Sequence, residues 1–266
     1  MNVAAATPLA AIRRVIPSNG QRRAPEGPAA RRPAAVSHLP THCSTCNLRE
    51  VCLPCGLAHP DIELLGDIVY TRKRVKRGES LFHTGTGFES IFAVRSGFFK
   101  ASTLLEDGRD QVTGFHMAGE VLGMDGIGSG SHTVDVVALE DSEVCVIPYE
   151  RLNDPQMQRQ LQKVMSRELV RDQGVMMLLG TMRAEERLAA FLLNLSQRFV
   201  ARGFSPSEFH LRMTREEIGS YLGLSLETVS RLFSRFQADD LISVQQKHIC
   251  ILDVPGLRAV MIHEKD

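Results

Sequence analysis

The sequence predicts an α+β protein with a β-rich domain, one long helix and a C-terminal winged helix-turn-helix module. Three observations support this fold class. Short β-like runs broken by glycines fill residues 68 to 147, a heptad pattern follows over Pro155–Thr181, and two short helical patterns flank a glycine turn near the C-terminus. With 266 residues, of which 43% are apolar, the chain is long enough for two domains with their own cores.

The composition narrows the class of protein only slightly. The 31 basic and 31 acidic residues balance, so net charge argues neither for nor against a nucleic-acid partner. No run approaches about eighteen apolar residues, and the first 40 residues contain no continuous apolar core. We therefore expect no membrane span, no secretory signal and a cytoplasmic protein.

Residues 1–40 are rich in Ala, Pro and Arg, with Glu26 as their only acid. This composition superficially resembles an organellar transit peptide, but the repeated prolines argue against the amphipathic helix that such peptides form. We expect a disordered tail.

Residues 41–60 contain four closely spaced cysteines, in the pattern C-x2-C-x5-C-x2-C: Cys43, Cys46, Cys52 and Cys55. Thiolates at this density favour zinc or an iron–sulfur cluster, whereas a disulfide scaffold is not expected in a chain of this length. Two alternatives remain open. All four could close a tetrahedral zinc site, or three could share a cluster with a distant fourth ligand. The candidates for that ligand are Cys145 and Cys250, each in a β-like apolar run where a lone cysteine is usually a small buried hydrophobe.

Residues 61–153 alternate short β-rich runs with glycine turns, which predicts an all-β barrel or sandwich. The glycine-rich stretch GEVLGMDGIGSGSHTVDV could cradle a phosphate, but it lacks both the strand–loop–helix context and the G-x-x-x-x-G-K-[ST] spacing. We interpret its glycines as turn residues. No nucleophile–base constellation is found, so we do not expect an enzyme.

Residues 154–181 form the long helix, with seam positions at alternating spacings of four and three: Met165, Leu169, Asp172, Met176 and Leu179. This is the pattern of a two-stranded coiled coil, in which Asp172 occupies a position that favours an apolar side chain. Two paired helices would bring two carboxylates together, and desolvating each charge costs several kcal/mol. The helix is therefore predicted to dimerise weakly. Alternatively, Asp172 lies on a solvated edge beside Arg171 or fixes the register.

Residues 182–266 carry the helix-turn-helix. The stretch AEERLAAFLLNLSQRF is amphipathic, and RGFSP ends it. Thr214 is a predicted N-cap with Glu217 completing a capping box, Gly223 lies in the turn, and a second helix covers Leu226–Ala238. LISVQQKHICILD then reads as the β-hairpin of a winged helix.

The second helix has an apolar face of Val229, Leu232, Phe233 and Phe236. Its opposite face carries Glu227, Ser230, Arg231, Ser234 and Arg235. Arg can fork onto guanine, Glu can accept from cytosine and Ser can serve either base. A charged stripe is often merely solvated, but the turn and the apolar back favour double-stranded DNA. Such modules bind as dimers to half-sites about one helical turn apart.

Taken together, residues 40 to 255 resemble the cyclic-AMP receptor protein superfamily, and within it the oxygen-sensing fumarate and nitrate reduction regulators. The resemblance rests on the C-x2-C-x5-C run, the cysteine in ALEDSEVCVIP, the stretch RAEERLAAF, and ETVSR in the second helix. It implies a jelly-roll, cyclic-nucleotide-binding-like β domain in a global regulator of anaerobic transcription.

The resemblance also implies roles for individual residues. Cys43, Cys46, Cys52 and Cys145 would ligate a [4Fe-4S] cluster, with Cys55 outside the family pattern. Glu227, Ser230 and Arg231 match base-reading positions for TTGAT-type half-sites. Asp172 matches a seam carboxylate whose repulsion keeps the cluster-free protein monomeric, so the loaded chain would be a homodimer. An alternative is a regulator of the same fold with structural zinc in the cysteine run and a different signal.

Two further expectations come from the resemblance. Relatives contact RNA polymerase through the turn that corresponds to Glu106, Asp107, Gly108, Arg109 and Asp110. Relatives that bind cyclic AMP hold its phosphate with an arginine in the loop after a Gly-Glu pair. This sequence has no arginine between Gly119-Glu120 and Val137, so no cyclic nucleotide is expected.

Overall fold

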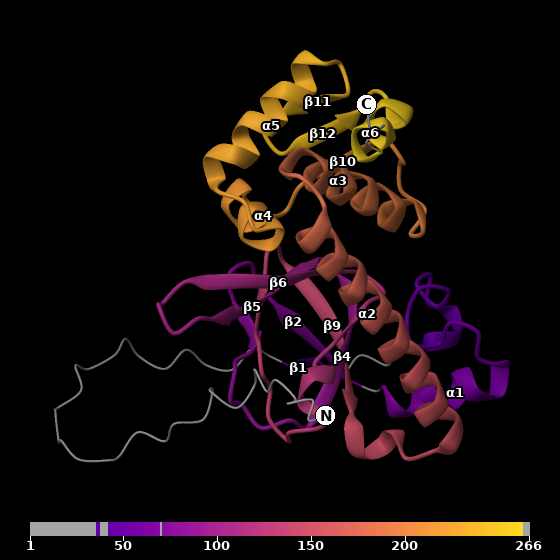
Figure 1. Cartoon of the computed structure of the whole chain (residues 1–266). Helices are drawn as coiled ribbons and strands as arrows, with labels where there is room; N and C mark the ends of the chain where they lie inside the picture. Colours follow the sequence, from indigo (N-terminus) through magenta and orange to yellow (C-terminus); the bar gives the residue numbers. More distant parts are fainter. Residues whose placement is uncertain (1–35, 38–41, 70, 263–266) are drawn as a thin grey trace, which may run out of the picture. The chain divides into compact units, whose positions relative to one another are not determined.

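The computed structural model describes residues 36–37, 42–69 and 71–262. Their elements follow the predicted order of a β-rich domain, a long helix and a helix-turn-helix, so the expected fold class is confirmed (Figure 1). None of the described helices is long and apolar enough to cross a membrane. The predicted tail over residues 1–40 lies outside the described residues except for Val36–Ser37.

The β domain is built from two antiparallel sheets with the strand orders β1-β2-β9-β4-β7 and β3-β8-β5-β6. Among the described strands, pairing does not join the two sheets into one closed barrel. The strands are β1 (Val36–Ser37), β2 (Thr71–Val75), β3 (Ser80–Phe82), β4 (Ser90–Ser96), β5 (Phe98–Leu104), β6 (Asp110–Met117), β7 (Val121–Leu122), β8 (Asp135–Ala138) and β9 (Ser142–Pro148).

The residues of β1 pair with Lys73 and Arg72 of β2, although the composition of this region predicts disorder. The two strands pair through backbone groups, so an unfavourable composition does not prevent a short strand at a sheet edge.

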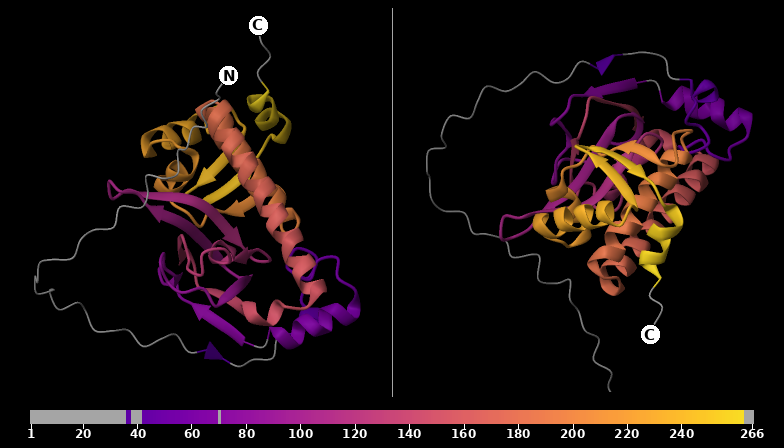
Figure 2. Two further views of the ribbon diagram at one scale, coloured as in Figure 1. Left: turned by 60° about the horizontal axis from the view of Figure 1, so that its bottom comes forward. Right: turned by 90° about the horizontal axis from the view of Figure 1, so that it is seen from above.

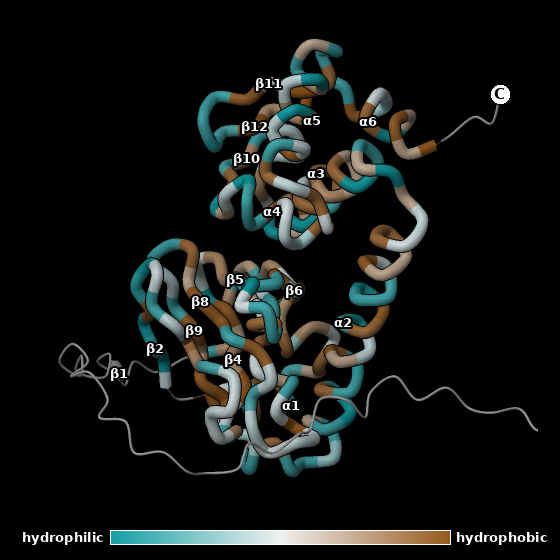
Figure 3. The backbone as a smooth tube through the Cα atoms, turned by 60° about the vertical axis from the view of Figure 1, so that its left-hand side comes forward, coloured by the Kyte–Doolittle hydropathy of each residue, from teal (hydrophilic) through white to brown (hydrophobic). Residues whose placement is uncertain are grey.

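Apolar side chains from both sheets fill the space between them, including Phe99, Val136 and Val144, which are at most 1% exposed. The backbone tube in Figure 3 shows this concentration of hydrophobic residues along β4, β8 and β9. The turn between β4 and β5 requires Gly97, which has a φ of +94°, because an added Cβ would lie 2.0 Å from Ser142 Oγ. The β domain therefore follows from alternating apolar residues and a few obligatory glycines.

The cysteine segment lies between β1 and β2 in the chain and consists of η2 (Cys43–Thr45), a series of turns and α1 (His59–Ile68). Two further 3-10 turns, η3 (Met124–Gly126) and η4 (Tyr149–Leu152), lie within and after the β domain.

The long helix α2 spans Pro155–Thr181, the range predicted from the sequence. Asp154 caps it by accepting hydrogen bonds from the backbone N–H groups of Gln156 and Met157, and Pro155 occupies the first turn, where no N–H donor is needed. Figure 2 shows α2 as one continuous helix. Its N-terminal half is buried through Met157, Gln160, Leu161 and Val164.

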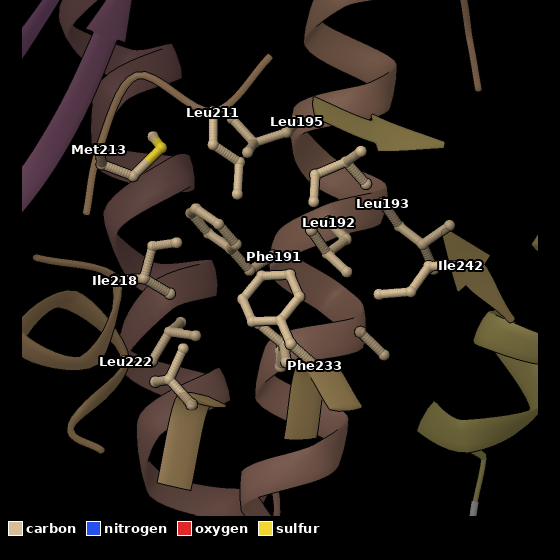
Figure 4. Close-up of a cluster of buried hydrophobic side chains, with 14 of the residues drawn as sticks. Phe191, Leu192, Leu193, Leu195, Leu211, Met213, Ile218, Leu222, Phe233 and Ile242 are labelled. Carbon is tan, nitrogen blue, oxygen red and sulfur yellow. The ribbon is translucent and has the colours of Figure 1, made fainter. Parts of the chain in front are cut away.

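The C-terminal module comprises α3 (Ala184–Val200), β10 (Glu208–His210), α4 (Arg215–Leu222), α5 (Leu226–Ala238), β11 (Ile242–Gln245), β12 (His248–Ile251) and α6 (Val254–Met261). The predicted capping box is confirmed: Thr214 Oγ1 accepts from Glu217 N at 3.1 Å, and Glu217 Oε2 accepts from Thr214 N at 2.7 Å. The predicted hairpin is β11 and β12, with β10 added at its edge. In Figure 4, Phe191 and Leu192 of α3 lie in one cluster with Ile218, Phe233 and Ile242.

Candidate functional site

A small pocket of about 30 Å³ gathers four cysteines from two distant parts of the chain. Its other lining residues are mainly apolar, including Leu53, Leu65 and Ile147. The cysteines are Cys43, Cys46 and Cys52 from the cysteine segment and Cys145 from β9. The donor set consists of soft sulfur atoms in an apolar surrounding, which fits an iron–sulfur cluster held by four thiolates.

The cysteine segment owes its shape to successive tight turns. The backbone N–H of Cys46 donates to the carbonyl of Cys43 at 3.3 Å, and that of Cys52 donates to the carbonyl of Leu48 at 2.9 Å. Gln160 of α2 anchors the segment from the other side, since its Nε2 donates to the carbonyls of Leu53 at 2.7 Å and Cys55 at 2.8 Å. The cysteine segment is thus fixed to the helix that carries the predicted dimer seam.

The remaining cysteines lie elsewhere. Cys55 is not among the pocket residues, and Cys250 lies in β12 of the C-terminal module. No three His, Cys, Asp or Glu side chains in the described part of the chain are grouped closely enough to hold a single metal ion. The thiols thus surround a pocket instead of meeting at one point, and Cys145 is the fourth member of the set.

Burial controls the protonation of the thiols. It raises the pKa of Cys43 to about 11 and that of Cys52 to about 12. Burial also raises the pKa of Cys145, which Arg95 acts to lower. Arg95 donates to Cys46 Sγ at 3.8 Å and pairs with Glu143 at 3.4 Å. The thiols of Cys43, Cys52 and Cys145 are therefore protonated at neutral pH when no metal is bound, and ligation would release their protons.

The predicted seam on α2 is largely exposed in the single chain. Leu169 is 62% exposed and Met176 is 66% exposed, whereas Met165 and Leu179 are half-buried. All five seam residues, including Asp172, line a cleft of about 860 Å³ together with apolar residues of the β domain such as Val134 and Val136. An apolar stripe of this kind indicates a surface that another element covers.

Asp172 is exposed, and its neighbour Arg171 points elsewhere. Arg171 pairs with Glu120 at 3.2 Å and with Glu168 at 2.5 Å. The carboxylate of Asp172 is therefore left on the seam side of the helix, where two paired helices would face one another.

The helix-turn-helix presents α5 as the sequence predicts. Val229, Leu232, Phe233 and Phe236 are buried, which confirms the apolar face. Glu227, Arg231 and Ser234 are exposed on the other face, while Ser230 is half-buried and its carbonyl accepts from Ser234 Oγ at 3.2 Å. Ser225 caps the start of the helix, and its Oγ accepts from Thr228 N.

Arg235 lies on the polar face of α5, but its guanidinium is already paired within the chain. Its Nη1 pairs with Glu185 of α3 at 2.7 Å, and its Nε lies 3.7 Å from Asp239. Arg231 makes a long contact of 3.4 Å to Thr228 Oγ1 and interacts electrostatically with Glu227. Of the two arginines, Arg231 makes no ion pair as close as that of Arg235 with Glu185 among the described residues.

The turn from Glu106 to Asp110 joins β5 to β6 and is exposed throughout. Gly108 has a φ of +83°, and its N–H donates to the carbonyl of Leu105 at 2.9 Å. Arg109 pairs with Asp107 at 2.7 Å. The turn is thus a defined, charged protrusion of the kind that a protein partner can contact.

Sequence reasoning missed several residues around these sites. Gln160 is 1% exposed and is the polar member of an otherwise apolar helical face with Met157, Leu161 and Val164. A polar residue within an apolar helical face is a signal in the sequence that could have pointed to a buried hydrogen-bonding role for Gln160. Glu120 and Arg95 gave none, because their partners lie far away in the sequence.

Comparisons with known proteins agree with this arrangement. A family model described as a cyclic nucleotide-binding domain matches residues 72–158, and one described as a Crp-like helix-turn-helix domain matches residues 186–260. The solved structure of FixK2 from Bradyrhizobium japonicum superposes with a TM-score of 0.67 at 28% identity, covering 73% of this chain and 98% of that one.

Two curated relatives cover most of the chain. The transcriptional activator protein Anr of Pseudomonas protegens is 49% identical over 222 residues, which is 82% of this chain and 91% of the relative. The fumarate and nitrate reduction regulatory protein of Salmonella typhimurium is 44% identical over 230 residues, or 85% and 92% of the two chains. The chain therefore belongs to the family of fumarate and nitrate reduction and Anr-type transcriptional activators, DNA-binding regulators and not enzymes.

Proposed function

We propose that this regulator senses oxygen through a [4Fe-4S] cluster ligated by Cys43, Cys46, Cys52 and Cys145. One observation carries the proposal: the fold brings Cys145 of β9 into the same pocket as the three cysteines of the N-terminal segment and leaves Cys55 outside it. When bound, such a cluster supplies iron–thiolate bonds that oxygen can break down.

The protein side of the switch is the link between the cysteine segment and α2. With all four thiols engaged, the segment is fixed against β9 on one side and bonded to Gln160 on the other. Gln160 precedes the first seam residue, Met165, by little more than one helical turn. Release of the thiols frees the segment and therefore removes a restraint on the helix that must pair.

Dimerisation depends on the balance between apolar packing and charge repulsion along α2. Packing of Met165, Leu169, Met176 and Leu179 between two chains favours association, since apolar surface leaves water. Repulsion between the two Asp172 carboxylates opposes it, by about 2–3 kcal/mol for charges about 6 Å apart at an effective dielectric constant of about 20. A modest free-energy contribution from the cysteine segment is therefore enough to shift the monomer–dimer equilibrium.

The dimer would bind TTGAT-type palindromic operators through α5 of each chain, with Glu227, Ser230 and Arg231 at the base edges. Their exposure on one face supports this role. The charged turn from Glu106 to Asp110 would contact RNA polymerase. The β domain would take no cyclic nucleotide, because the carboxylate of Glu120 is already bound by arginines of its own chain. We place the protein in the cytoplasm, controlling anaerobic gene expression.

The ligand set is tested with two matched variants purified without oxygen. We expect Cys145→Ser to abolish iron binding and Cys55→Ser to retain it, measured as iron and sulfide per chain. The opposite result would assign the fourth thiolate to Cys55. Zinc bound by the parent, without iron or sulfide, would support a structural zinc site and a different signal.

A further inference from the structure

Glu120 lies in the turn between β6 and β7, and its carboxylate contacts three arginines. Its side chain is only 11% exposed. Arg171 of α2 lies 3.2 Å away, Arg198 of α3 2.7 Å and Arg202, just beyond α3, 2.8 Å. One carboxylate of the β domain thus meets both the long helix and the helix that begins the C-terminal module.

The two arginines near the end of α3 strengthen this connection through backbone contacts. Arg198 Nη2 donates to the carbonyl of Phe115 at 2.6 Å, and Arg202 Nε donates to the carbonyl of Ala118. Arg202 also donates to the carbonyl of Arg198 at 2.6 Å, which fixes the two arginines relative to each other. The end of α3 is therefore held along the last residues of β6 and the turn that follows.

Glu120 supplies the negative charge that faces the arginines where the β domain meets α2 and α3. Burial alone would raise its pKa, but Arg198 and Arg171 outweigh that effect and lower it to about 2, so the carboxylate is ionised at neutral pH. The neighbouring His116 is neutral, because burial and Arg171 lower its pKa to about 3. Arg171 has a second carboxylate partner, Glu168. Among the described ion pairs, Arg198 and Arg202 each pair with Glu120.

Two other ion pairs join the two parts, Lys100 with Glu217 at 3.3 Å and Arg212 with Glu140 at 2.8 Å, and other contacts between the parts are apolar or neutral. Phe115 of β6 packs against Phe191 and Tyr221 with ring centroids 6.2 and 5.2 Å apart, and Val112 N donates to Ser220 Oγ at 2.8 Å. Phe191 belongs to the same core as Phe233 of α5. The position of α5, the recognition helix of the helix-turn-helix, therefore depends on how α3 packs on β6.

We propose that Glu120 is a positioning residue for operator binding, which seats the C-terminal module on the β domain and α2 so that two recognition helices keep the spacing of two half-sites. This inference rests on the proposed binding of a palindromic operator by a dimer. The half-sites lie about one helical turn apart, so both helices must engage at once. A loosely seated module lowers the effective concentration of the second helix and with it the affinity for the palindrome.

The test uses full-length, anaerobically loaded protein and compares Glu120→Gln, Glu120→Asp and the exposed control Glu150→Gln. Fluorescence anisotropy measures binding to a duplex with two half-sites and to one with a single half-site. We expect Glu120→Gln to weaken binding to the palindrome roughly 10- to 100-fold. Binding to the single half-site should change by less than about twofold, because the base-reading face is intact. Glu120→Asp, which restores the charge, should recover most of the loss, and Glu150→Gln should match the parent.

Light scattering and iron analysis on the same samples should show an unchanged dimer and iron content. Equal or tighter binding of the palindrome by Glu120→Gln would overturn the proposal, as would an equal loss on both duplexes. If Glu120→Gln does not fold, Arg171→Met replaces it, because this change removes the contact of α2 with Glu120, together with the pairing of Arg171 with Glu168, and leaves Arg198 and Arg202 on Glu120. We expect a smaller loss of the same kind, and no loss would overturn the proposal.

A second readout separates this inference from the proposed function. Calorimetry of the protein as purified needs neither cluster nor operator. We expect Glu120→Gln to unfold at a lower temperature than the parent, because Arg198 and Arg202 lose their carboxylate partner while the shared apolar core remains. A parent that fails to dimerise or to bind DNA would refute the proposed function, while an unchanged unfolding temperature in Glu120→Gln would refute the role of Glu120.

Discussion

Replacing Gln160 with methionine should weaken dimerisation without preventing cluster binding. The side chain is buried, and its Nε2 donates to the carbonyls of Leu53 and Cys55 at 2.7 and 2.8 Å. Its Oε1 is buried and has no hydrogen-bond partner within the described chain. Methionine has a similar length and fills the same space without a donor.

The change in the free energy of unfolding is the sum of two opposing contributions. Losing two hydrogen bonds costs about 1–3 kcal/mol at about 0.5–1.5 kcal/mol each. Removing a buried, unpartnered amide oxygen recovers about 1–3 kcal/mol. The free energy of unfolding should therefore change little. What is lost is the link between the cysteine segment and α2, and a coupling of about 1–3 kcal/mol corresponds to a dimer Kd raised about 5- to 150-fold.

The assay is analytical ultracentrifugation of anaerobic protein with matched iron content, accompanied by thermal unfolding. Lys163→Met serves as the control, since Lys163 is exposed on the same helix and lies outside the seam spacing. We expect Gln160→Met to shift the monomer–dimer equilibrium toward monomer and the control to leave it unchanged. A dimer Kd equal to that of the parent at equal iron content would refute the reasoning, and so would the same weakening in the control.

Three other predictions concern the seam, the operator and the pH dependence. Asp172→Ala removes the opposed carboxylates and should give a dimer that binds operator in air; equal dissociation of variant and parent on an aerobic sizing column would contradict this. Arg231→Ala should cost about 1–3 kcal/mol at one base position, whereas a uniform loss across operator variants would indicate a phosphate contact. The contribution of Glu120 to stability is fully present above its ordinary pKa of 4.5 and is lost as pH falls toward about 2. The melting temperature of the parent should therefore fall over this range more than that of Glu120→Gln.

Local signals in the sequence predicted the helices well. The bounds of α2 and α5 agree with the predicted ranges because both helices have clear start signals, Asp154 with Pro155 for the first and Ser225 for the second. The capping box at Thr214 is equally local, since its two partners are three residues apart. Periodicity and capping act within one helical turn, so a single sequence carries them in full.

The parts that could not be predicted depend on contacts across long stretches of chain. Spacing alone left Cys145 and Cys250 both open as the distant ligand, and the family resemblance implied Cys145. The pairing of β9 with β2 and β4 brings Cys145 to the cysteine segment. Gln160 and Leu53 are separated by 107 residues, and Glu120 and Arg202 by 82. Arg235 was assigned to the DNA-reading face because its position fits, but its pairing with Glu185 depends on how α3 packs against α5.

The most direct test of the account measures iron, sulfide and subunit number on one anaerobic preparation before and after a pulse of air. The account predicts about four irons and four sulfides per chain and a dimer without oxygen, followed by loss of the visible absorbance and dissociation to monomers in air. Protein that contains no iron when first isolated without oxygen, or whose subunit number is the same with and without iron, would contradict the central claim.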